Sequence, residues 1–267
     1  VFKLKRSLYG LKQSPRCWNR KFTGVPNKYG LQVSDSDPCL FTSKDRKLLI
    51  ALYVNDGLVA AQNQSHLSRF LEELKAHFEI TVSPVSNFLG LQVTQHDNGS
   101  VFVCQEDYTK KMLAKFGMTD CNPVMTPMEK NYLTVENEEP VSAGTPYREA
   151  VGSLLYLATG TRPDIAYAVN TVSQAVCAPS QKDWQAVKRI FRYLKGTSHL
   201  GIAYSATHIS DGLSVYSDAD YAGDIKSRKS TSGVLAQYNG GAVTWSSKKQ
   251  SSVALSTTEL ELMAACE

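Results

Sequence analysis

The chain has 267 residues, of which 42% are hydrophobic and 20% charged, and its formal net charge at pH 7 is +4. This is ordinary globular composition, with enough apolar residues for one or two hydrophobic cores. No apolar run approaches the roughly 20 residues of a membrane-spanning helix, and no secretory signal opens the chain. We therefore expect an intracellular protein without a membrane segment. Its ends, Val1 and Glu267, suggest cuts from a longer polypeptide, because the chain does not begin with Met and stops inside a helical pattern.

The six cysteines are scattered, with no Cys-x-x-Cys pair and no paired histidines nearby. A zinc site and a disulfide framework are therefore not expected, and a reducing compartment fits this pattern. Cys17 lies near Lys and Arg and could act as a reactive thiol, but a small residue on a helix face is the simpler interpretation.

Basic residues dominate the start of the chain. No acidic residue precedes Asp35, whereas several basic residues do. Such a block predicts a surface that faces a polyanion, although charge alone fits a solvated helix face equally well. The basic residues are Lys3, Lys5, Arg6, Lys12, Arg16, Arg20, Lys21 and Lys28.

The first predicted element is a helix from about Ser7 to Phe22, with Ser7 as its N-cap and apolar residues along one side. Gly10 in its first turns costs about 1 kcal/mol of helix stability relative to alanine. A glycine there makes sense if another molecule must approach the backbone closely. Pro15 interrupts the helical hydrogen-bond ladder, so we expect a kink at that position.

A β-hairpin is predicted further along the chain, after a strand entry over 37–42. Two apolar runs, 48–54 and 58–61, flank Asn55-Asp56-Gly57, and these turn residues tolerate a positive φ. A carboxylate at the tip of such a hairpin could hold a cation. On spacing alone, an aspartate at a hairpin turn more often serves the turn itself.

Two of these segments together resemble a known family. The run Ser-Leu-Tyr-Gly-Leu-Lys-Gln-Ser-Pro-Arg-Cys-Trp over 7–18 and the Tyr-Val-x-Asp hairpin over 53–56 are similar to the reverse transcriptase of copia-type LTR retrotransposons. In that family the hairpin reads Tyr-Val-Asp-Asp, and its aspartates bind the catalytic Mg²⁺ ions. The resemblance implies that Asp56 is a catalytic metal ligand and that Asn55 occupies the position of the other aspartate. It also implies nucleotide or template binding by Tyr9, Gly10, Lys12, Gln13 and Arg16.

The apolar spacing after the hairpin predicts further helices and strands, which we assign to core packing. Runs within them again resemble copia-type sequence. The helices are predicted over 65–77 and 105–116, and the strands over 78–82, 87–95 and 101–104, with a hairpin at Asn98-Gly99.

Residues 117–146 are rich in Pro, Asn and Glu with weak periodicity, which predicts a linker. Two helices follow within 147–177, broken at Arg162-Pro163, where Asp164 is placed to cap the second helix. A third helix over 183–195 has a basic outer side, a fair but unspecific nucleic-acid face. The basic residues of that helix are Lys188, Arg189, Arg192 and Lys195.

The last part of the chain changes to short strands, followed by a helix that opens at Thr257. The runs that contain Asp218 and Glu259 resemble the copia-type ribonuclease H domain, which implies that these are its first two catalytic carboxylates and ligands of Mg²⁺. By the same resemblance, Asp220 and Asp224 are loop and structural carboxylates. Cleavage with two Mg²⁺ ions about 4 Å apart needs several converging oxygen ligands. The strands are predicted over 213–217, 231–238 and 242–245, with a hairpin turn at 239–241.

These elements together predict an α+β chain with four parts. The first is a partial polymerase palm with the hairpins and helix that follow it, and the second is the linker. A helical connector and the opening strands and helix of a ribonuclease H-like domain complete the chain. The expected bounds are 1–116, 117–146, 147–210 and 211–267.

The resemblance implies a fragment of a retrotransposon Pol polyprotein that performs RNA-directed DNA synthesis and degrades RNA in the hybrid. Its implied partners are an RNA template, a DNA primer, an RNA–DNA hybrid and the other parts of the polyprotein. In the family, the polymerase takes a third carboxylate from an upstream strand, and the nuclease takes further aspartates from downstream. Because this chain shows neither, and because Asn55 replaces another carboxylate, we predict that it is inactive in both reactions.

Three alternatives remain open. The first is a host-recruited nucleic-acid-binding module that keeps the basic surfaces without the chemistry. The second is an inert transposon relic with no selected role, for which a stable fold is not required. In the third, flanking sequence supplies the missing carboxylates, and Asn55 is the only lesion.

Overall fold

The computed structural model describes residues 4, 7–8, 10–130, 132, 139–207 and 212–267. The chain divides into two compact units, 1–89 and 90–267, and each is described here by itself. Both units combine helices with antiparallel strands, so the predicted α+β class is confirmed. Among the described residues, no helix combines the length and the apolar character needed to cross a membrane.

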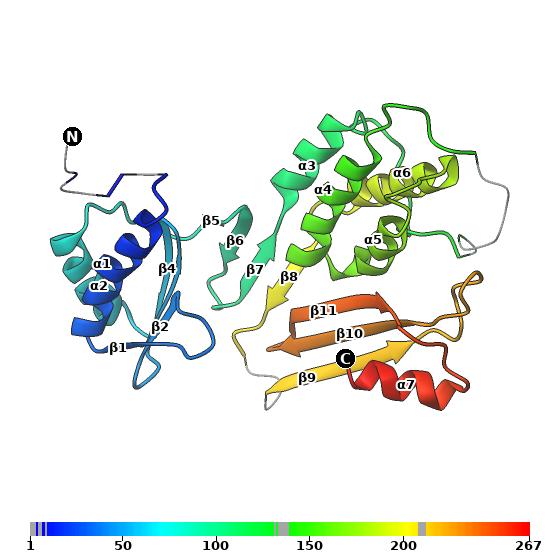
Figure 1. Ribbon diagram of the computed structural model, residues 1–267. Helices are drawn as coiled ribbons and strands as arrows, with labels where there is room; N and C mark the ends of the chain where they lie inside the picture. Colours follow the sequence, from blue (N-terminus) through cyan, green and yellow to red (C-terminus); the bar gives the residue numbers. More distant parts are fainter. Residues whose placement is uncertain (1–3, 5–6, 9, 131, 133–138, 208–211) are drawn as a thin grey trace. The chain divides into compact units, whose positions relative to one another are not determined.

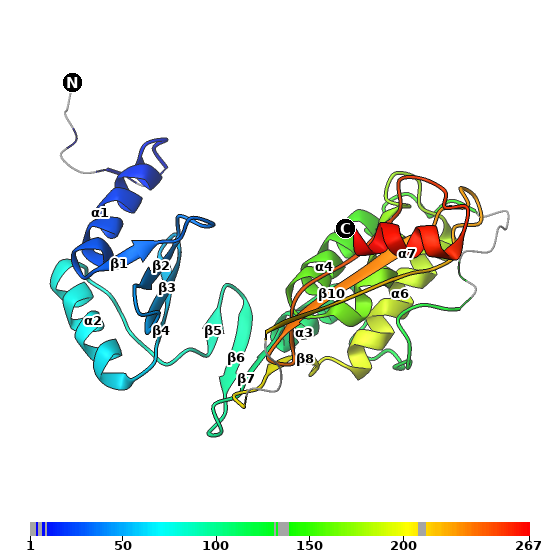
Figure 2. The ribbon, with the colours of Figure 1, turned by 90° about the horizontal axis from the view of Figure 1, so that it is seen from below.

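The first unit is a four-stranded antiparallel sheet with two helices on one face (Figures 1 and 2). The strands lie in sequence order, so each connection joins neighbouring strands. Side chains of both helices share one apolar cluster with alternate residues of the strands. The elements are α1 (Ser14–Lys28), β1 (Leu31–Val33), β2 (Leu40–Ser43), β3 (Leu48–Tyr53), β4 (Asp56–Ala61) and α2 (Gln64–His77).

Strand β3 shows why this sheet has one covered and one open face. Leu48, Ile50 and Leu52 are buried against the helices. Leu49 and Tyr53, which alternate with them, are exposed. This period of two is that of a strand with one face toward the core.

The first helix begins at Ser14, and the prediction of a helix from Ser7 was wrong. Gly10 has φ +89°, in the left-handed region that a glycine adopts easily, and the chain turns there. Pro15 therefore lies in the first turn of α1, where its missing N–H costs no helical hydrogen bond, and does not introduce the predicted kink. A different proline, Pro26, lies inside the helix.

The second unit contains two sheets and a set of helices. One sheet pairs β6 with β7 and β7 with β8, and the other has the order β11-β10-β9. Helices α4, α5 and α6 supply most of one large buried cluster. The elements are β6 (Leu91–Gln95), β7 (Val101–Cys104), α3 (Glu106–Lys115), α4 (Tyr147–Gly160), the 3-10 turn η1 (Pro163–Ile165), α5 (Ala166–Ser173), α6 (Gln181–Gly196), β8 (Gly201–Tyr204), β9 (Leu213–Ala219), β10 (Thr231–Tyr238), β11 (Gly241–Lys249) and α7 (Thr257–Ala265).

The β9–β11 sheet lies between α7 and the helices α4 and α5 (Figures 1 and 2). The indole N–H of Trp245 donates to the carbonyl of Ala158 at 2.6 Å, and Asn170 donates to the carbonyl of Ser247. These bonds join β11 to α4 and α5. The end of the chain and the helices before it are therefore parts of one packed unit.

Several predicted elements differ from those observed. Residues 78–82 form no strand, and the predicted strand over 87–95 is split into β5 (Asn87–Phe88) and β6 by positive φ angles at Leu89 and Gly90. The sequence analysis missed β1 and β8, which are short strands. Both depend on pairing with another segment rather than on a long apolar pattern.

Candidate functional site

The hairpin between β3 and β4 has a two-residue turn formed by Val54 and Asn55. Tyr53 pairs directly with Asp56, and the ladder continues to Leu48 and Ala61. The prediction of a turn at Asn55-Asp56-Gly57 was therefore one residue too late. Val54 has φ +54°, whereas Asn55 has no positive φ, so the strained position is the β-branched one.

Asp56 lies on the open face of the first sheet. Residues that pair directly across an antiparallel ladder have side chains on the same face. Asp56 is opposite Tyr53, which is 59% exposed, and both alternate with residues that face the helices. The carboxylate that the resemblance assigns to the metal is thus away from the core and accessible.

The basic segment before α1 is also exposed. Lys12, Gln13 and Arg16 are exposed residues at the start of the helix, and Gly10 forms the turn before it. Tyr9 lies outside the described residues, as do Lys3, Lys5 and Arg6 of the basic block. The described part keeps Arg16 and Arg20 one helical turn apart on α1.

Trp18 of α1 links this segment to the hairpin. Its indole N–H donates to the carbonyl oxygen of Val54 at 2.8 Å, across 36 positions of sequence. Trp18 and Val54 each belong to a motif in the sequence, but the sequence pattern indicates no role for either. Their presence in the two runs that carry the family resemblance was the available signal.

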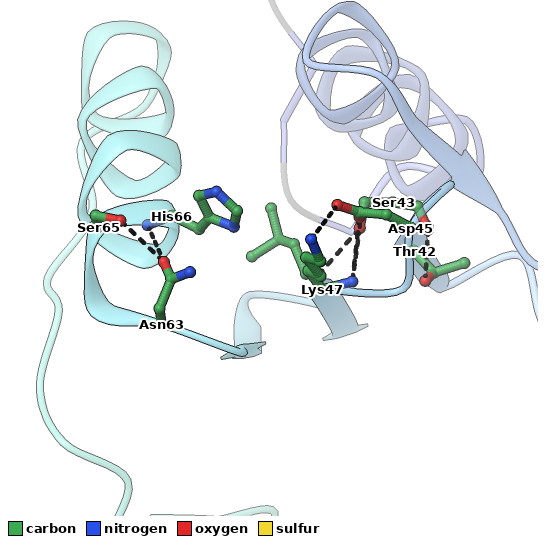
Figure 3. Close-up of polar contacts among 8 residues, drawn as sticks. Thr42, Ser43, Asp45, Lys47, Asn63, Ser65 and His66 are labelled. Atoms are coloured by element: carbon green, nitrogen blue, oxygen red, sulfur yellow. Dashed lines mark hydrogen bonds and ion pairs between the residues drawn. The ribbon is translucent and has the colours of Figure 1, made fainter.

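A hollow of about 380 Å³ lies at the other end of β3 and β4, beside Asp45, Arg46 and Lys47. Asp45 accepts hydrogen bonds from the Ser43 hydroxyl at 2.6 Å and from the Lys47 amide at 3.2 Å (Figure 3). The bond from Ser43 is the main cause that lowers the pKa of Asp45. This carboxylate closes the β2–β3 turn, and the arrangement suggests no chemistry.

In the second unit, Asp218 and Glu259 lie on neighbouring elements. Asp218 is exposed on β9, opposite Gly233 of β10, and Glu259 is exposed in the first turn of α7. The Glu259 carboxylate accepts a hydrogen bond from the Leu255 amide at 2.7 Å. Ser256 caps the helix by accepting from the Glu259 amide at 3.2 Å. In the structure, Glu259 therefore holds the chain at the start of α7.

Asp220 and Asp224 are engaged in holding the β9–β10 loop. Asp220 accepts from the amide of Thr231, and Asp224 pairs with Lys249 and accepts from the Ser227 hydroxyl at 2.8 Å. Burial by itself would raise the pKa of Asp224. The hydrogen bonds from Lys249 and Ser227 outweigh burial and lower that pKa to about 2.

Part of the basic side of α6 is used within the chain. Arg189 donates to Glu129 and to Thr126, each at 3.0 Å. Arg192 donates to the carbonyl of Asn122 at 2.7 Å. These bonds fasten the segment after α3 to the helix, so two of the four cations expected to face nucleic acid are engaged elsewhere.

The acid at the break between α4 and α5 does not cap a helix, contrary to the prediction. Asp164 accepts two hydrogen bonds from Arg162, at 2.9 and 2.7 Å, and one from Tyr193 at 2.8 Å. Arg162 is only 2% exposed and also donates to Thr197. Pairing the buried guanidinium stabilises the fold more than capping a helix would, because an unpaired buried charge is far more unfavourable than an uncapped helix end.

The described residues do not by themselves fit a two-Mg²⁺ site. Among them, no group of three or more His, Cys, Asp or Glu side chains is arranged to hold a metal ion. At the hairpin, Asp56 offers one carboxylate and Asn55 can offer only a neutral amide oxygen. Mg²⁺ prefers hard, anionic oxygen ligands in near-octahedral geometry, so a second and third carboxylate would have to come from elsewhere.

Comparisons with known proteins find relatives that match nearly the whole chain. A family model described as reverse transcriptase (RNA-dependent DNA polymerase) matches residues 1–130. The chain is 38% identical over 279 residues to the retrovirus-related Pol polyprotein from transposon TNT 1-94 of Nicotiana tabacum, a match that covers 100% of this chain and 21% of that protein. It is 37% identical over 265 residues to the corresponding polyprotein from transposon RE1 of Arabidopsis thaliana, covering 98% of this chain and 18% of the relative.

A shorter relative is an uncharacterized mitochondrial protein of Arabidopsis thaliana, 34% identical over 218 residues, which cover 81% of this chain and 90% of that protein. No solved structure matches the chain. The family model over residues 1–130 assigns this part of the chain to the reverse transcriptase class. More particularly, the chain belongs to the family of copia-type retrotransposon Pol polyproteins. It spans about a fifth of the length of the transposon polyproteins that it matches.

Proposed function

We propose that this chain is a nucleic-acid-binding part of a copia-type reverse transcriptase that does not itself synthesise DNA. The observation that carries the proposal is the hairpin, where Asp56 lies on an open sheet face and Asn55 replaces the family's other aspartate. The proposed partners are an RNA template, a DNA primer and their hybrid, together with the other parts of a polyprotein. Exposed Lys12, just before α1, and exposed Arg16, in its first turn, would contact phosphates.

The expected inactivity follows from charge. Asparagine keeps the size and one oxygen of aspartate but loses a full negative charge next to two divalent ions. Two unit charges 4 Å apart interact by roughly 4 kcal/mol at an effective dielectric constant of ~20, and a divalent ion doubles that energy. An energy of about 8 kcal/mol corresponds to nearly six orders of magnitude in a dissociation constant, so even the fraction of it that survives solvent screening weakens metal binding strongly.

Residues 211–267 are proposed to be the start of a ribonuclease H-like domain, following a helical connector over 147–210 and a linker over 117–146. Three antiparallel strands followed by a helix that packs on them support this assignment. Asp218 and Glu259 would be two of its Mg²⁺ ligands. Because no third carboxylate joins these two among the described residues, this site is also proposed to be inactive in the chain as it stands.

The test combines binding with catalysis. A fluorescent RNA–DNA hybrid is titrated with the chain at several salt concentrations, and primer extension is assayed with Mg²⁺. We expect salt-sensitive binding without extension. The double variant K12Q/R16Q should weaken binding and reduce the slope of log affinity against log salt by up to about 2, since each lost phosphate contact removes nearly one released counterion.

The matched control is K44Q/R46Q, which removes the same charge from the turn at the other end of the β3–β4 hairpin. This control should bind with nearly the wild-type slope. Equal losses in both variants would show that only net charge matters. Extension by the unaltered chain would refute the inactivity, and absence of binding at low salt would remove the proposal altogether.

A further inference from the structure

We infer that Trp18 is a positioning residue for the Val54–Asn55 turn, because its indole N–H fixes the backbone on which Asn55 and Asp56 lie. The inference rests on the proposed function only in that the proposal assigns this turn to a polymerase site. Trp18 itself would touch neither metal nor substrate. It would act through the carbonyl oxygen of Val54.

The first observation is the hydrogen bond itself. Trp18 Nε1 lies 2.8 Å from the Val54 oxygen, well within the range of a good N–H···O bond. The two residues are 36 positions apart, so helix geometry alone does not bring them together. The bond joins α1 directly to the residue that precedes Asn55.

The second observation is the conformation of Val54. A φ of +54° is a rare backbone angle for a β-branched residue. Such conformations cost on the order of 1–3 kcal/mol and persist only when surrounding structure enforces them. Val54 is 59% exposed, so packing of its side chain does not enforce this one. The two-residue turn and the indole bond remain as the restraints.

The third observation is that the indole is itself held in place. The ring of Trp18 lies 5.6 Å from that of Phe78 with the planes at 73°, and 6.0 Å from that of Phe22. Phe22 is buried in the core of the first unit, and Phe78 ends α2 with its amide bonded to Leu74. A donor fixed by two aromatic neighbours can restrain the turn, whereas a mobile one could not.

The experiment separates a positioning role from a merely structural one by comparing W18F with F22L in the full chain. W18F keeps an aromatic ring and removes the donor. F22L weakens the same aromatic cluster and leaves the donor. Backbone amide exchange at Asn55 and Asp56 is measured by NMR, together with the midpoint of thermal unfolding. In the wild type and in F22L, the NMR signal of the Trp18 indole N–H is compared with that of Trp245. The Trp245 indole donates to the carbonyl of Ala158 and serves as the reference for a hydrogen-bonded indole.

We expect W18F to accelerate amide exchange at Asn55 and Asp56 by about fivefold, the population change that corresponds to losing one hydrogen bond of about 1 kcal/mol. F22L should lower the unfolding midpoint and change these two exchange rates less than twofold. Unchanged exchange in W18F, or equal acceleration in both variants, would overturn the inference. Neither outcome depends on metal or nucleic-acid binding.

A second arm connects the turn to its proposed chemistry. The variant N55D restores the second carboxylate, and Mn²⁺ binding to it is followed by paramagnetic broadening of the Asp56 amide. We expect N55D/W18F to bind Mn²⁺ about fivefold more weakly than N55D, and N55D/F22L to bind within twofold of N55D. If N55D binds no Mn²⁺, the metal assignment of the turn fails while the exchange result still decides the role of Trp18.

Discussion

Three acidic residues of the second unit and Asp56 of the first unit are used in opposite ways. In the second unit, Asp164, Asp224 and Glu259 each accept hydrogen bonds that hold a loop or a helix start. In the first unit, Asp56 lies on an open sheet face, and a tryptophan restrains the backbone beside it. Carboxylates close to family motifs are thus not equivalent. Some stabilise the fold, and others are available for chemistry.

The comparison predicts an ordering of stability effects. Replacing a carboxylate that holds structure should destabilise its unit in proportion to the burial of its partner. Replacing one that is available should leave stability unchanged. The expected effects therefore decrease from the carboxylate with the most buried partner to the most exposed carboxylate.

The largest effect is expected for Asp164. D164A leaves Arg162 almost fully buried without its carboxylate, and we expect a loss of about 3 kcal/mol in the free energy of unfolding. The measurement is urea unfolding followed by the NMR signals of the Trp184 and Trp245 indoles, which both lie in the second unit. The double variant R162M/D164A should recover a large part of the lost stability, because it also removes the buried guanidinium that D164A leaves without its carboxylate. Equal stability of D164A and the wild type would contradict the buried network.

Asp224 should come second and show a pH signature. Its side chain is 14% exposed and pairs with Lys249, so D224N should cost about 1–2 kcal/mol. Because its pKa is lowered to about 2 from the ordinary value of 3.8 for an aspartate, the stabilisation is present above pH 4 and is lost as the pH falls toward 2.

Unfolding free energies measured between pH 6 and pH 2 test this signature. The wild type and D224N should converge as the pH falls, whereas D164A should keep part of its deficit, because Arg162 stays buried without a full complement of partners. A constant gap between D224N and the wild type would show that the ion pair is not its cause.

These structural roles show what the sequence could and could not reveal. The β3–β4 hairpin followed from local chemistry, since Asn, Asp and Gly between apolar runs favour a turn. The exact turn position did not, because it depends on the pairing of Tyr53 with Asp56. Asp164 was expected to cap a helix, since its partner Arg162 is recognisable as buried only in the folded chain. The bond from Trp18 to Val54 links segments whose proximity no local pattern encodes.

Glu259 should show a smaller effect with a distinctive dependence on the substituent. E259A removes the acceptor for the Leu255 amide and should cost about 1 kcal/mol, the usual value for a helix N-terminal contact. E259Q keeps an acceptor oxygen and should cost less than about 0.5 kcal/mol. If E259Q were as damaging as E259A, the negative charge rather than the hydrogen bond would be the stabilising feature, as the helix dipole allows.

The smallest effect is expected for Asp56, and it is the sharpest test of the comparison. Because Asp56 lies on the open face at the end of a two-residue turn, D56N should change the free energy of unfolding of the first unit by less than about 0.5 kcal/mol. Urea unfolding followed by the NMR signal of the Trp18 indole reports on this unit. A loss as large as that of D224N would show that Asp56 holds the fold, and the contrast between the two units would then disappear. Unchanged stability, together with loss of Mn²⁺ binding in N55D/D56N relative to N55D, would show that this carboxylate is retained for the metal rather than for the hairpin.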